Sequence, residues 1–470
     1  MSGPISLEPG DAGQDTLALR LAEPRPSRRR PRWALDDATL AIRLPGHGPD
    51  EEAVSTLAAE LADAIGPAVH PYEVAALLEA EGLSASLIKE RYGHPNLFSL
   101  ATALYERVPR TFPEPPPATD PWRPDTLRCL LRGVLFALPA LAYLLIAPLW
   151  PIDRHAPVLI VAGIASWAWG QALGHRAHLR LVTGRREASG TLLAGSALGA
   201  AVATALAALP ADGAMAIGVA AAQSLYLAGA SVLLVLGRER LLLAALSPLV
   251  AGAAVLPWWE PGPVLRVGLP LLALLATSVA AGRVLWAGRA GQAASDAGRP
   301  RLRASLPYGL FGLAAAVLVM LEGRRQPYAV IALTLSMGPA EWLLYRYRGW
   351  SVAALRVSAT PGTFLLRSAA VLGLCLSGYL LLLLPAALLT DSEASLLLLA
   401  AALWTALLLQ AFGVAWPPAV LCLAAAGAAG AVTLLHLPPG PAVLPAACGV
   451  AAVCLAACAI RLLGRPSPHA

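Results

Sequence analysis

The feature that most constrains this chain is a series of long apolar runs that recurs from residue 128 onward, separated by short polar gaps. A helix needs about 20 apolar residues to cross a bilayer, and twelve of the runs are close to that length. Their approximate bounds are 128–149, 156–175, 190–209, 213–236, 241–259, 263–286, 304–322, 328–346, 366–389, 394–414, 417–437 and 441–463. The sequence therefore predicts an all-α polytopic membrane protein with about 12 transmembrane helices.

Composition supports the same class. Hydrophobic residues make up 57% of the chain and charged residues only 14%, whereas a soluble globular protein carries about 25% charged residues. The six cysteines all lie in apolar runs, at spacings that match neither a zinc site nor a disulfide framework. We therefore expect no bound metal and no cofactor, and we interpret the thiols as small packing groups.

Charged residues are divided unevenly along the chain. Residues 1–127 contain 12 basic and 19 acidic side chains, whereas residues 128–470 contain 23 basic and 10 acidic ones. If the N-terminus is cytoplasmic, 19 of those 23 basic residues fall on the inner side, as the positive-inside rule requires. The pattern predicts a multi-pass protein of a bacterial plasma membrane with both termini in the cytoplasm, and it predicts no nucleic-acid partner.

The residues before the first span fall into three predicted parts. Residues 1–35 form a basic tail that we expect to be disordered, and residues 36–110 form a small acidic helical domain in the cytoplasm. Residues 111–127 form a Pro-rich linker, which is stiff and extended. The helical domain is either a docking module for a cytoplasmic protein partner or a passive extension of the membrane region.

An internal repeat relates two parts of the membrane region. The segment PVLIVAGIASWAWGQALGHRAH aligns with PYAVIALTLSMGPAEWLLYRYR at a constant offset of 170 residues. This offset pairs Pro157 with Pro327, Ser166 with Ser336, Gln171 with Glu341 and Arg176 with Arg346. The two segments are the second and the eighth predicted spans, so the repeat unit is six spans long.

The repeat divides the membrane region into two predicted bundles, residues 128–287 and 304–463. A basic cytoplasmic linker at 288–303 joins them, and a short C-terminal tail follows at 464–470. Because each copy has an even number of crossings, the two copies would be parallel six-helix repeats related by an axis along the membrane normal. Several secondary-transporter folds have this plan, in which two bundles rock around a central cavity.

One stretch of the eighth span resembles a known family. The stretch from Ser336 to Tyr347 has a small residue and Gly338, and after five intervening residues it has Leu344, Arg346 and Tyr347. This pattern resembles the end of an early span in the MOP superfamily, which includes polysaccharide and lipid-linked oligosaccharide flippases. The resemblance implies a multi-span flippase or exporter. The segment Gly184-Arg185-Arg186 invites comparison with the major facilitator superfamily, but it lacks that family's aspartate, and the first resemblance is preferred.

Polar side chains inside the spans are the candidates for substrate binding and coupling, because a polar group in hydrocarbon needs a partner or a wet cavity. Glu341 follows a probable kink at Gly338-Pro339. It is either a proton or cation coupling site or the ion-pair partner of Arg346 or Arg348. Three glutamines and one serine, Gln171, Gln223, Gln410 and Ser224, either line a substrate cavity or bridge neighbouring helices.

Two arginines complete the candidate substrate site. Arg266 lies several residues inside the outer boundary of the sixth span, and Arg283 lies near its inner end. Since guanidinium groups bind phosphate bidentately, these residues are candidates for holding an anionic substrate. The alternative for Arg266 is an ion pair with Glu260 or a position at the lipid headgroups.

Three function classes are compatible with these features. The preferred one is an alternating-access transporter or flippase for an amphipathic, anionic substrate such as a lipid-linked glycan or an exported polysaccharide. The second is a membrane scaffold whose cytoplasmic domain docks partners. The third is a polyprenyl-phosphate-dependent membrane glycosyltransferase, which is disfavoured because the outer gap that contains Asp153 is too short for an acceptor site. We therefore expect a non-enzyme with no catalytic residues.

Overall fold

A computed structural model describes residues 50–109, 123–290, 301–358, 360–390, 393–436, 438 and 440–465. The helices form two compact units, the first within residues 50–109 and the second from residue 123 onward. The predicted tail at 1–35 and most of the predicted linkers at 111–127 and 288–303 and of the tail at 464–470 lie outside the described residues.

The first unit consists of five short helices. They are α2 (Glu51–Glu60), α3 (Ala62–Ile65), α4 (Pro71–Ala80), α5 (Ala85–Tyr92) and α6 (Leu97–Arg107). Polar side chains begin three of them, since Asp50, Ser84 and Asn96 accept a hydrogen bond from a backbone N–H of the first turn. The core contains Leu78 and Leu100, both fully buried.

The second unit contains the membrane helices. They are α7 (Thr126–Ala137), α8 (Ala140–Ile146), α9 (Ile152–Thr183), α10 (Arg185–Ala207), α11 (Ala214–Val235), α12 (Glu239–Val255), α13 (Pro263–Arg289), α14 (Leu306–Arg325), α15 (Pro327–Leu335), α16 (Met337–Val357), α17 (Pro361–Leu389), α18 (Glu393–Ala411), α19 (Trp416–Leu435) and α20 (Val443–Leu463). The described residues form no β-strand.

Each of the twelve apolar runs corresponds to a helix or to a pair of consecutive helices, so the predicted all-α membrane architecture is confirmed. Ten helices of the described part are long and apolar enough to cross a bilayer. The other two runs correspond to α12, which has 17 residues, and to the pair α15 and α16, which is interrupted at Ser336.

Two helices extend beyond the apolar runs from which they were predicted. The second span was expected to end at residue 175, but α9 continues to Thr183 and is about 48 Å long at 1.5 Å per residue. The eighth was expected to end at residue 346, but α16 continues to Val357. Between Gly174 and Gly184 the sequence has no glycine or proline, and polar residues without a helix breaker continue a helix outside the bilayer.

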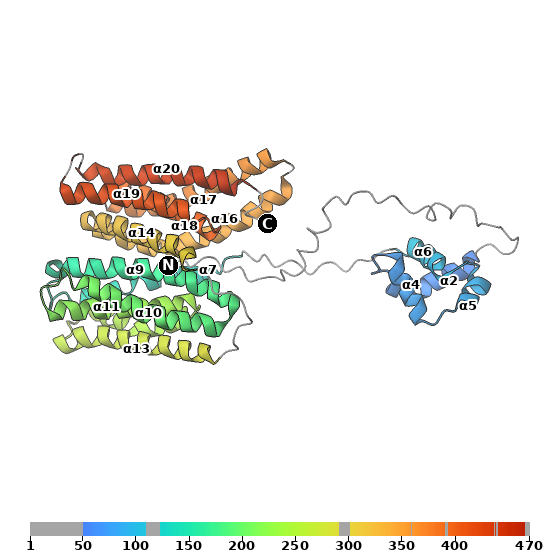
Figure 1. Cartoon of the computed structure of the whole chain (residues 1–470), viewed down its shortest axis with the longest axis horizontal. Coiled ribbons are helices and arrows are strands. Elements are labelled where there is room, and N and C mark those ends of the chain that lie inside the picture. The colour runs from blue at the N-terminus through green and yellow to red at the C-terminus, as the bar shows by residue number, and fades with distance from the viewer. Residues whose placement is uncertain are drawn as a thin grey trace. The chain divides into compact units, whose positions relative to one another are not determined.

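The two halves pack their helices in the same way. The repeat matches α9 with α15–α16, α10 with α17, α11 with α18, α12 with α19 and α13 with α20, and matched helices contact matched neighbours in the two halves. The first span follows the same rule, since α7–α8 packs on α12 and α13 and α14 packs on α19 and α20. Figure 1 shows the halves as two adjacent bundles, with α9 and α14 facing each other. This agreement confirms the predicted pair of six-helix repeats.

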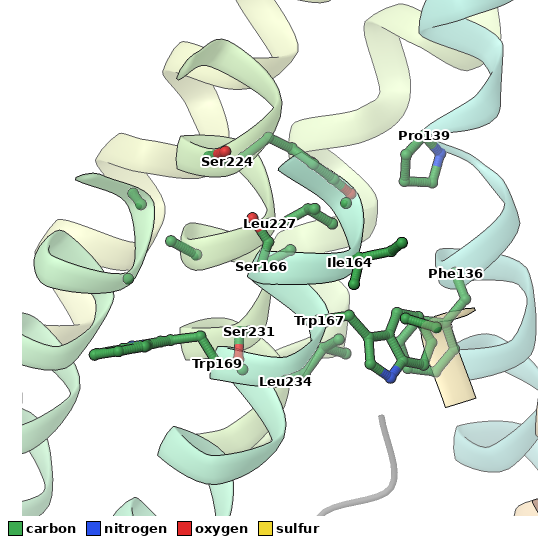
Figure 2. A pocket seen from close by; sticks show the side chains of 18 of the residues that line it. Phe136, Pro139, Ile164, Ser166, Trp167, Trp169, Ser224, Leu227, Ser231 and Leu234 are labelled. Atoms are coloured by element: carbon green, nitrogen blue, oxygen red, sulfur yellow. The ribbon is translucent and has the colours of Figure 1, made fainter. Parts of the chain in front are cut away.

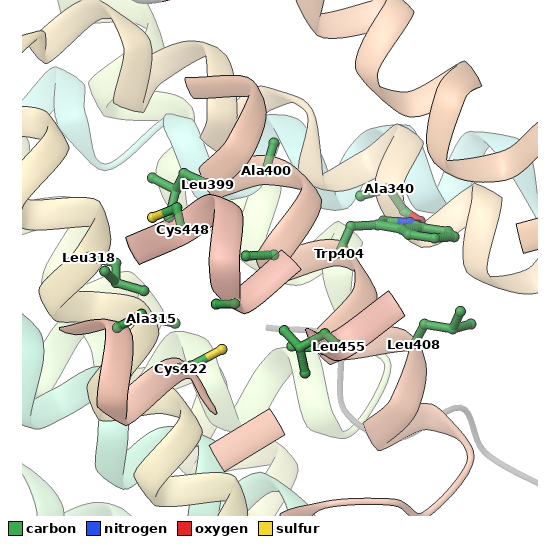
Figure 3. Packing of buried hydrophobic residues seen from close by; sticks show 14 of the residues in the cluster. Ala315, Leu318, Ala340, Leu399, Ala400, Trp404, Leu408, Cys422, Cys448 and Leu455 are labelled. Carbon is green, nitrogen blue, oxygen red and sulfur yellow. The ribbon is translucent and has the colours of Figure 1, made fainter. Parts of the chain in front are cut away.

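The core of the second half is filled by aliphatic and small side chains together with four buried aromatic residues, Phe311, Tyr347, Tyr379 and Trp404. Trp404, Leu408 and Leu455 are buried together with the thiols of Cys422 and Cys448 (Figure 3). The Trp404 indole N–H donates to the carbonyl oxygen of Ala340 at 3.2 Å, which ties α18 to α16. The buried thiols lie among apolar side chains, where cysteine behaves as a small hydrophobic residue.

Candidate functional site

The halves meet first where α7 crosses α15 and α16. Gly133 of α7 and Gly338 of α16 bring the two backbones into contact. A Cβ atom on Gly133 would lie 2.7 Å from the Leu335 carbonyl oxygen, and one on Gly338 would lie 2.7 Å from the Cys129 carbonyl oxygen. Both distances are shorter than a van der Waals contact, so this crossing requires glycine on both helices, as in other close membrane-helix pairs.

The second crossing between the halves, α9 against α14, is the repeat-related counterpart of the first. A Cβ atom on Gly312 would lie 2.7 Å from Cγ of Gln171 and 3.2 Å from Cα of Ala168. Ala168 is the residue that the offset of 170 pairs with Gly338. The interface between the halves therefore uses equivalent positions on the second and eighth spans, as an axis between them requires.

An ionic cluster lies beside the first crossing. The Arg132 guanidinium on α7 donates Nη1–H to Glu341 Oε1 on α16 and Nη2–H to Glu239 Oε1 on α12, the latter at 2.7 Å. Arg128 Nε–H donates to the same Glu239 oxygen at 2.9 Å. The side chains of Glu239 and Glu341 are only 6% and 9% exposed. One arginine of the first half thus holds a buried carboxylate from each half.

The sequence analysis placed Glu341 among the functional candidates but not Arg132 or Glu239. The ion-pair partner of Glu341 is Arg132, from the other half of the chain, rather than Arg346 or Arg348. Arg346 lies over the Trp342 ring at 4.8 Å, and Arg348 lies over the Phe412 ring at 5.2 Å. Pairs 107 and 209 residues apart leave no signal in local spacing, so only the tertiary structure could identify them.

The second crossing, α9 against α14, also has a side-chain contact on the predicted inner side of the protein, where most of the arginines lie. The His175 imidazole on α9 stacks on the Tyr308 ring of α14 with 3.8 Å between centroids. His175 Nδ1 also lies 3.0 Å from Ser305 Oγ, in hydrogen-bonding distance. The halves are therefore joined on this side by an ionic cluster at one crossing and by an aromatic stack at the other.

A small cavity of about 80 Å³ lies between the halves, next to the ionic cluster. Gln171 and Glu341, the repeat-related pair, both line it, together with Phe136, Tyr379 and Trp404. Residues at equivalent positions of two repeats line the same cavity when the pseudo-twofold axis that relates the repeats passes through that cavity. The structure thus brings together two of the six predicted site residues.

The larger cavity, about 240 Å³, lies mainly within the first half, among α7, α9, α10, α11, α14 and α15. Figure 2 shows Phe136, Trp167, Ser166, Ser224 and Ser231 around it. Five polar atoms of its lining are buried without a hydrogen-bond partner among the described residues: Ser166 Oγ, Trp167 Nε1, Ser196 Oγ, Ser224 Oγ and Ser231 Oγ. Buried polar groups are nearly always satisfied, so these five atoms are exceptions, and each has almost no accessible surface of its own toward the cavity.

At the corresponding level the second half has larger or hydrogen-bonded residues, and two of them, Leu333 and Ala340, line the smaller cavity. The offset of 170 pairs Gly163 with Leu333 and Gly170 with Ala340. Ser166 has no partner, whereas Ser336 Oγ lies 2.9 Å from the Tyr379 hydroxyl and also donates to the Leu333 carbonyl. The row of small residues Gly163, Ser166 and Gly170 on one face of α9 is the sequence signal for this cavity.

Gln223 and Gln410 lie elsewhere. The Gln223 Nε2–H group donates to the Leu159 carbonyl oxygen at 3.2 Å and so bridges α11 to α9. Gln410 is buried in α18, and its Nε2 has no partner among the described residues. Neither residue is part of the lining of the two cavities described above.

The two predicted anion-binding arginines are also separate from the cavities. Arg266 is buried, with Nε–H donating to the Pro261 carbonyl at 2.9 Å and Nη1–H to the Leu145 carbonyl at 3.3 Å, and Nη2 lies 3.8 Å from Glu260. It therefore satisfies the carbonyl end of α8. Arg283 is exposed on α13. Among the described residues, no group of three or more His, Cys, Asp or Glu side chains is arranged to hold a metal ion.

Comparison with solved structures finds distant similarity to MATE proteins and to a MOP superfamily transporter. No family model matches the chain, and no curated protein matches it. A MATE protein in complex with Br-NRF is 12% identical, with 73% of this chain and 98% of that chain covered and a TM-score of 0.41. A MOP superfamily transporter from Pyrococcus furiosus is 13% identical, with 73% and 97% covered and a TM-score of 0.40.

This is the superfamily that the sequence pattern resembles. A further MATE structure, in a bent conformation, has 13% identity, a TM-score of 0.39 and the same coverage of 73% and 97%. Neither the identity nor the TM-scores carry function to this chain, and its function is inferred from its own helices, cavities and charges.

Proposed function

We propose that this protein is an alternating-access membrane transporter of the flippase or exporter type. The observation that supports it is the pair of repeat-related crossings, α7 with α16 and α9 with α14, which join two otherwise separate bundles beside cavities. Two rigid bundles in contact along two equivalent lines can rock about them, which exposes a cavity to each side in turn.

The ionic cluster has a defined part in this mechanism. Arg132 joins the halves on the arginine-rich side, and Phe136, one turn further along α7, lines both cavities. Opening that side requires Arg132 to separate from Glu341, while Glu239 remains with Arg128 and Arg132 in the first half. In this account Glu341 becomes free to take up a proton or cation when the halves separate, which gives it the coupling role.

The substrate we propose is amphipathic, such as a lipid-linked glycan or an exported polysaccharide. The cavity supplies hydroxyl and indole groups that match a hydroxyl-rich head, and the surrounding spans supply an apolar path. Anionic groups would meet arginines at the membrane surface rather than inside the cavity, whose described lining has no charged side chain. We further propose a plasma-membrane location with both termini in the cytoplasm, where the helical unit α2–α6 would dock a protein partner.

Cross-linking between the halves tests this mechanism. In a variant without native cysteines, Arg132→Cys with Glu341→Cys places a thiol on each half, and a short bismaleimide joins them. The matched control is Leu159→Cys with Gln223→Cys, a contact within the first half. In liposomes containing a fluorescent lipid-linked oligosaccharide, the linker should arrest translocation in the first pair only. Equal translocation before and after linking of the first pair would refute the mechanism.

A further inference from the structure

The helical unit α2–α6 exposes a continuous group of four apolar and aromatic side chains. They lie just before α4 and in the first turns of α4 and α6, and they are Val69, His70, Tyr72 and Phe98. Val69, Tyr72 and Phe98 are 64%, 67% and 56% exposed. The Tyr72 ring lies 4.7 Å from the His70 ring and packs edge-on against the Phe98 ring, with 5.7 Å between centroids. We call these four residues the apolar patch.

Hydrogen bonds fix the backbone around the apolar patch. The Val69 N–H donates to the Glu73 carboxylate at 3.0 Å, and the Val69 carbonyl oxygen accepts from the Tyr105 hydroxyl at 2.6 Å. The Tyr72 N–H donates to His70 Nδ1 at 3.2 Å. The helices α4 and α6 pack against each other (Figure 1). The unit therefore keeps the patch in one arrangement, and such preorganisation lowers the cost of binding.

The surface around the apolar patch is acidic. Residues 50–109 contain ten acidic and three basic side chains, a formal charge of −7. On α4 the exposed Glu79 follows Tyr72 by seven residues, and on α6 the exposed Glu106 follows Phe98 by eight, so each carboxylate shares a helix face with a ring of the patch. A surface of this charge repels anionic lipid headgroups and nucleic-acid phosphates. It fits a basic segment that also carries apolar side chains.

The chain itself contains such a segment. Residues 25–33, RPSRRRPRW, contain five arginines, one tryptophan and no acidic residue, and they lie outside the described residues. Arginine stacks on aromatic rings and pairs with carboxylates. The 17 residues from Trp33 to Asp50 can span up to about 60 Å, whereas a unit of 60 residues has a radius of gyration of about 10 Å. The segment can therefore reach every face of the unit.

We propose that the basic segment 25–33 docks on the apolar patch of its own unit. Its arginines stack on Tyr72 and Phe98 and pair with Glu79 and Glu106. A tethered segment is present at an effective concentration in the millimolar range, so a protein partner that docks on this unit must first displace it. This regulation rests on the proposed docking role of the unit, whereas the contact itself depends on neither docking nor transport.

Photo-cross-linking in the full chain, reconstituted in nanodiscs, tests the contact. Benzoylphenylalanine replaces Phe98 in one variant. In the control it replaces Leu87, which is 40% exposed on α5 and lies outside the patch. Cleavage after glutamate leaves residues 24–51 in one peptide and residues 91–106 in another, so mass spectrometry identifies the link. The probe at position 98 should link to the peptide of residues 24–51, and the probe at position 87 should not.

Charge variants separate docking from chance encounters. Arg28→Gln with Arg29→Gln and Arg30→Gln removes three contacts, each worth about two- to fivefold in affinity, so the docking equilibrium should shift about tenfold or more and the yield at position 98 should fall. Arg20→Gln with Arg43→Gln is the matched control, because both arginines lie outside the segment, and the yield should stay the same. Sodium chloride at 1 M, where the Debye length is about 3 Å, should also lower the yield.

Three results would overturn the proposal. The first is an equal yield from positions 98 and 87, or no link from position 98 to the peptide of residues 24–51. The second is a link between chains only, seen in mixtures of isotopically light and heavy protein, which would assign the patch to a second copy. The third is a phospholipid adduct at position 98 in place of the peptide link, which would assign the patch to the membrane surface. None of these results bears on the cross-link between Arg132→Cys and Glu341→Cys, so this inference and the transport mechanism fail separately.

Discussion

Replacing Arg132 by leucine should be one of the most damaging single changes in the membrane region. Its guanidinium is 16% exposed and holds two carboxylates, those of Glu239 and Glu341. Without it, Glu239 keeps Arg128, but Glu341 loses the one ion pair recorded for it among the described residues. Removing one member of a buried pair costs about 3–5 kcal/mol, so we expect a loss of about 3 kcal/mol in the free energy of unfolding.

Two further variants serve as comparisons for the expected loss of stability in Arg132→Leu. Arg128 is 48% exposed and contacts Glu239 only at the edge of the cluster, so Arg128→Leu should cost about 0–1 kcal/mol. Arg132→Leu combined with Glu341→Leu removes the stranded carboxylate, and buried pairs replaced by apolar groups are often close to neutral. The double variant should therefore be more stable than Arg132→Leu alone.

The assay is reversible unfolding in mixed micelles, in which a denaturing detergent is titrated and helix content is followed by circular dichroism. The expected order of stability is the native protein, then Arg128→Leu, then the double variant, then Arg132→Leu. If Arg132→Leu unfolds at the same detergent fraction as Arg128→Leu, then Glu341 does not depend on Arg132, and the account of the ionic cluster is refuted.

Three further predictions follow from single contacts. Gly133→Ala should weaken the contact between the halves, because the new Cβ atom would lie 2.7 Å from the Leu335 carbonyl oxygen. Gly378→Ala is the control, since its Cβ atom would have open space around it and stability should not change. Unfolding in mixed micelles distinguishes the two variants. Arg266→Ala should lower stability in the same assay by leaving the Leu145 and Pro261 carbonyls unpaired, and unaltered stability together with reduced translocation of the lipid-linked oligosaccharide would restore Arg266 to the substrate site. In the unit α2–α6, burial and the nearby Arg107 lower the pKa of His94 below its ordinary value of 6.5. Since the unfolded state then binds the proton more readily, this histidine should reduce the stability of the unit as the pH falls from 7 through its folded pKa, and hydrogen exchange at the imidazole C2 position should report a midpoint below 6.5.

The repeat could be predicted from the sequence because it is visible in the alignment of two continuous segments. The two segments related by an offset of 170 share a few residues in the same order, such as Pro157 with Pro327 and Ser166 with Ser336. The number of spans was readable for a similar reason, since each span must satisfy the thickness of the bilayer by itself. The ends of α9 and α16 were not, because outside the bilayer hydropathy no longer limits a helix.

The candidate site was predicted only in part. Glu341 and Gln171 line one cavity, but Arg266 and Arg283 lie apart from both cavities, and Arg132 was recognised only as an inner arginine. Because a charged side chain is costly inside the bilayer, the sequence indicates which residues need a partner, but it does not indicate which partner each of them has. Ser224 was expected to line a cavity or to bridge helices, and it belongs to the lining of the larger cavity. Ser231 was not singled out, since an intramembrane serine usually bonds within its own helix, and only the packing shows that it does not.

By itself, the sequence determined that the chain is a bundle of membrane helices in two related copies with its arginines on one side. Hydrophobic thickness and charge bias act on each segment separately, so a linear reading captures them. Only the tertiary structure decided that the copies meet at Gly133 and Gly338, that Arg132 holds a carboxylate from each, and that the larger of the two cavities lies mainly within the first copy. Such contacts depend on which helix faces are brought together, and distance along the chain carries no record of that.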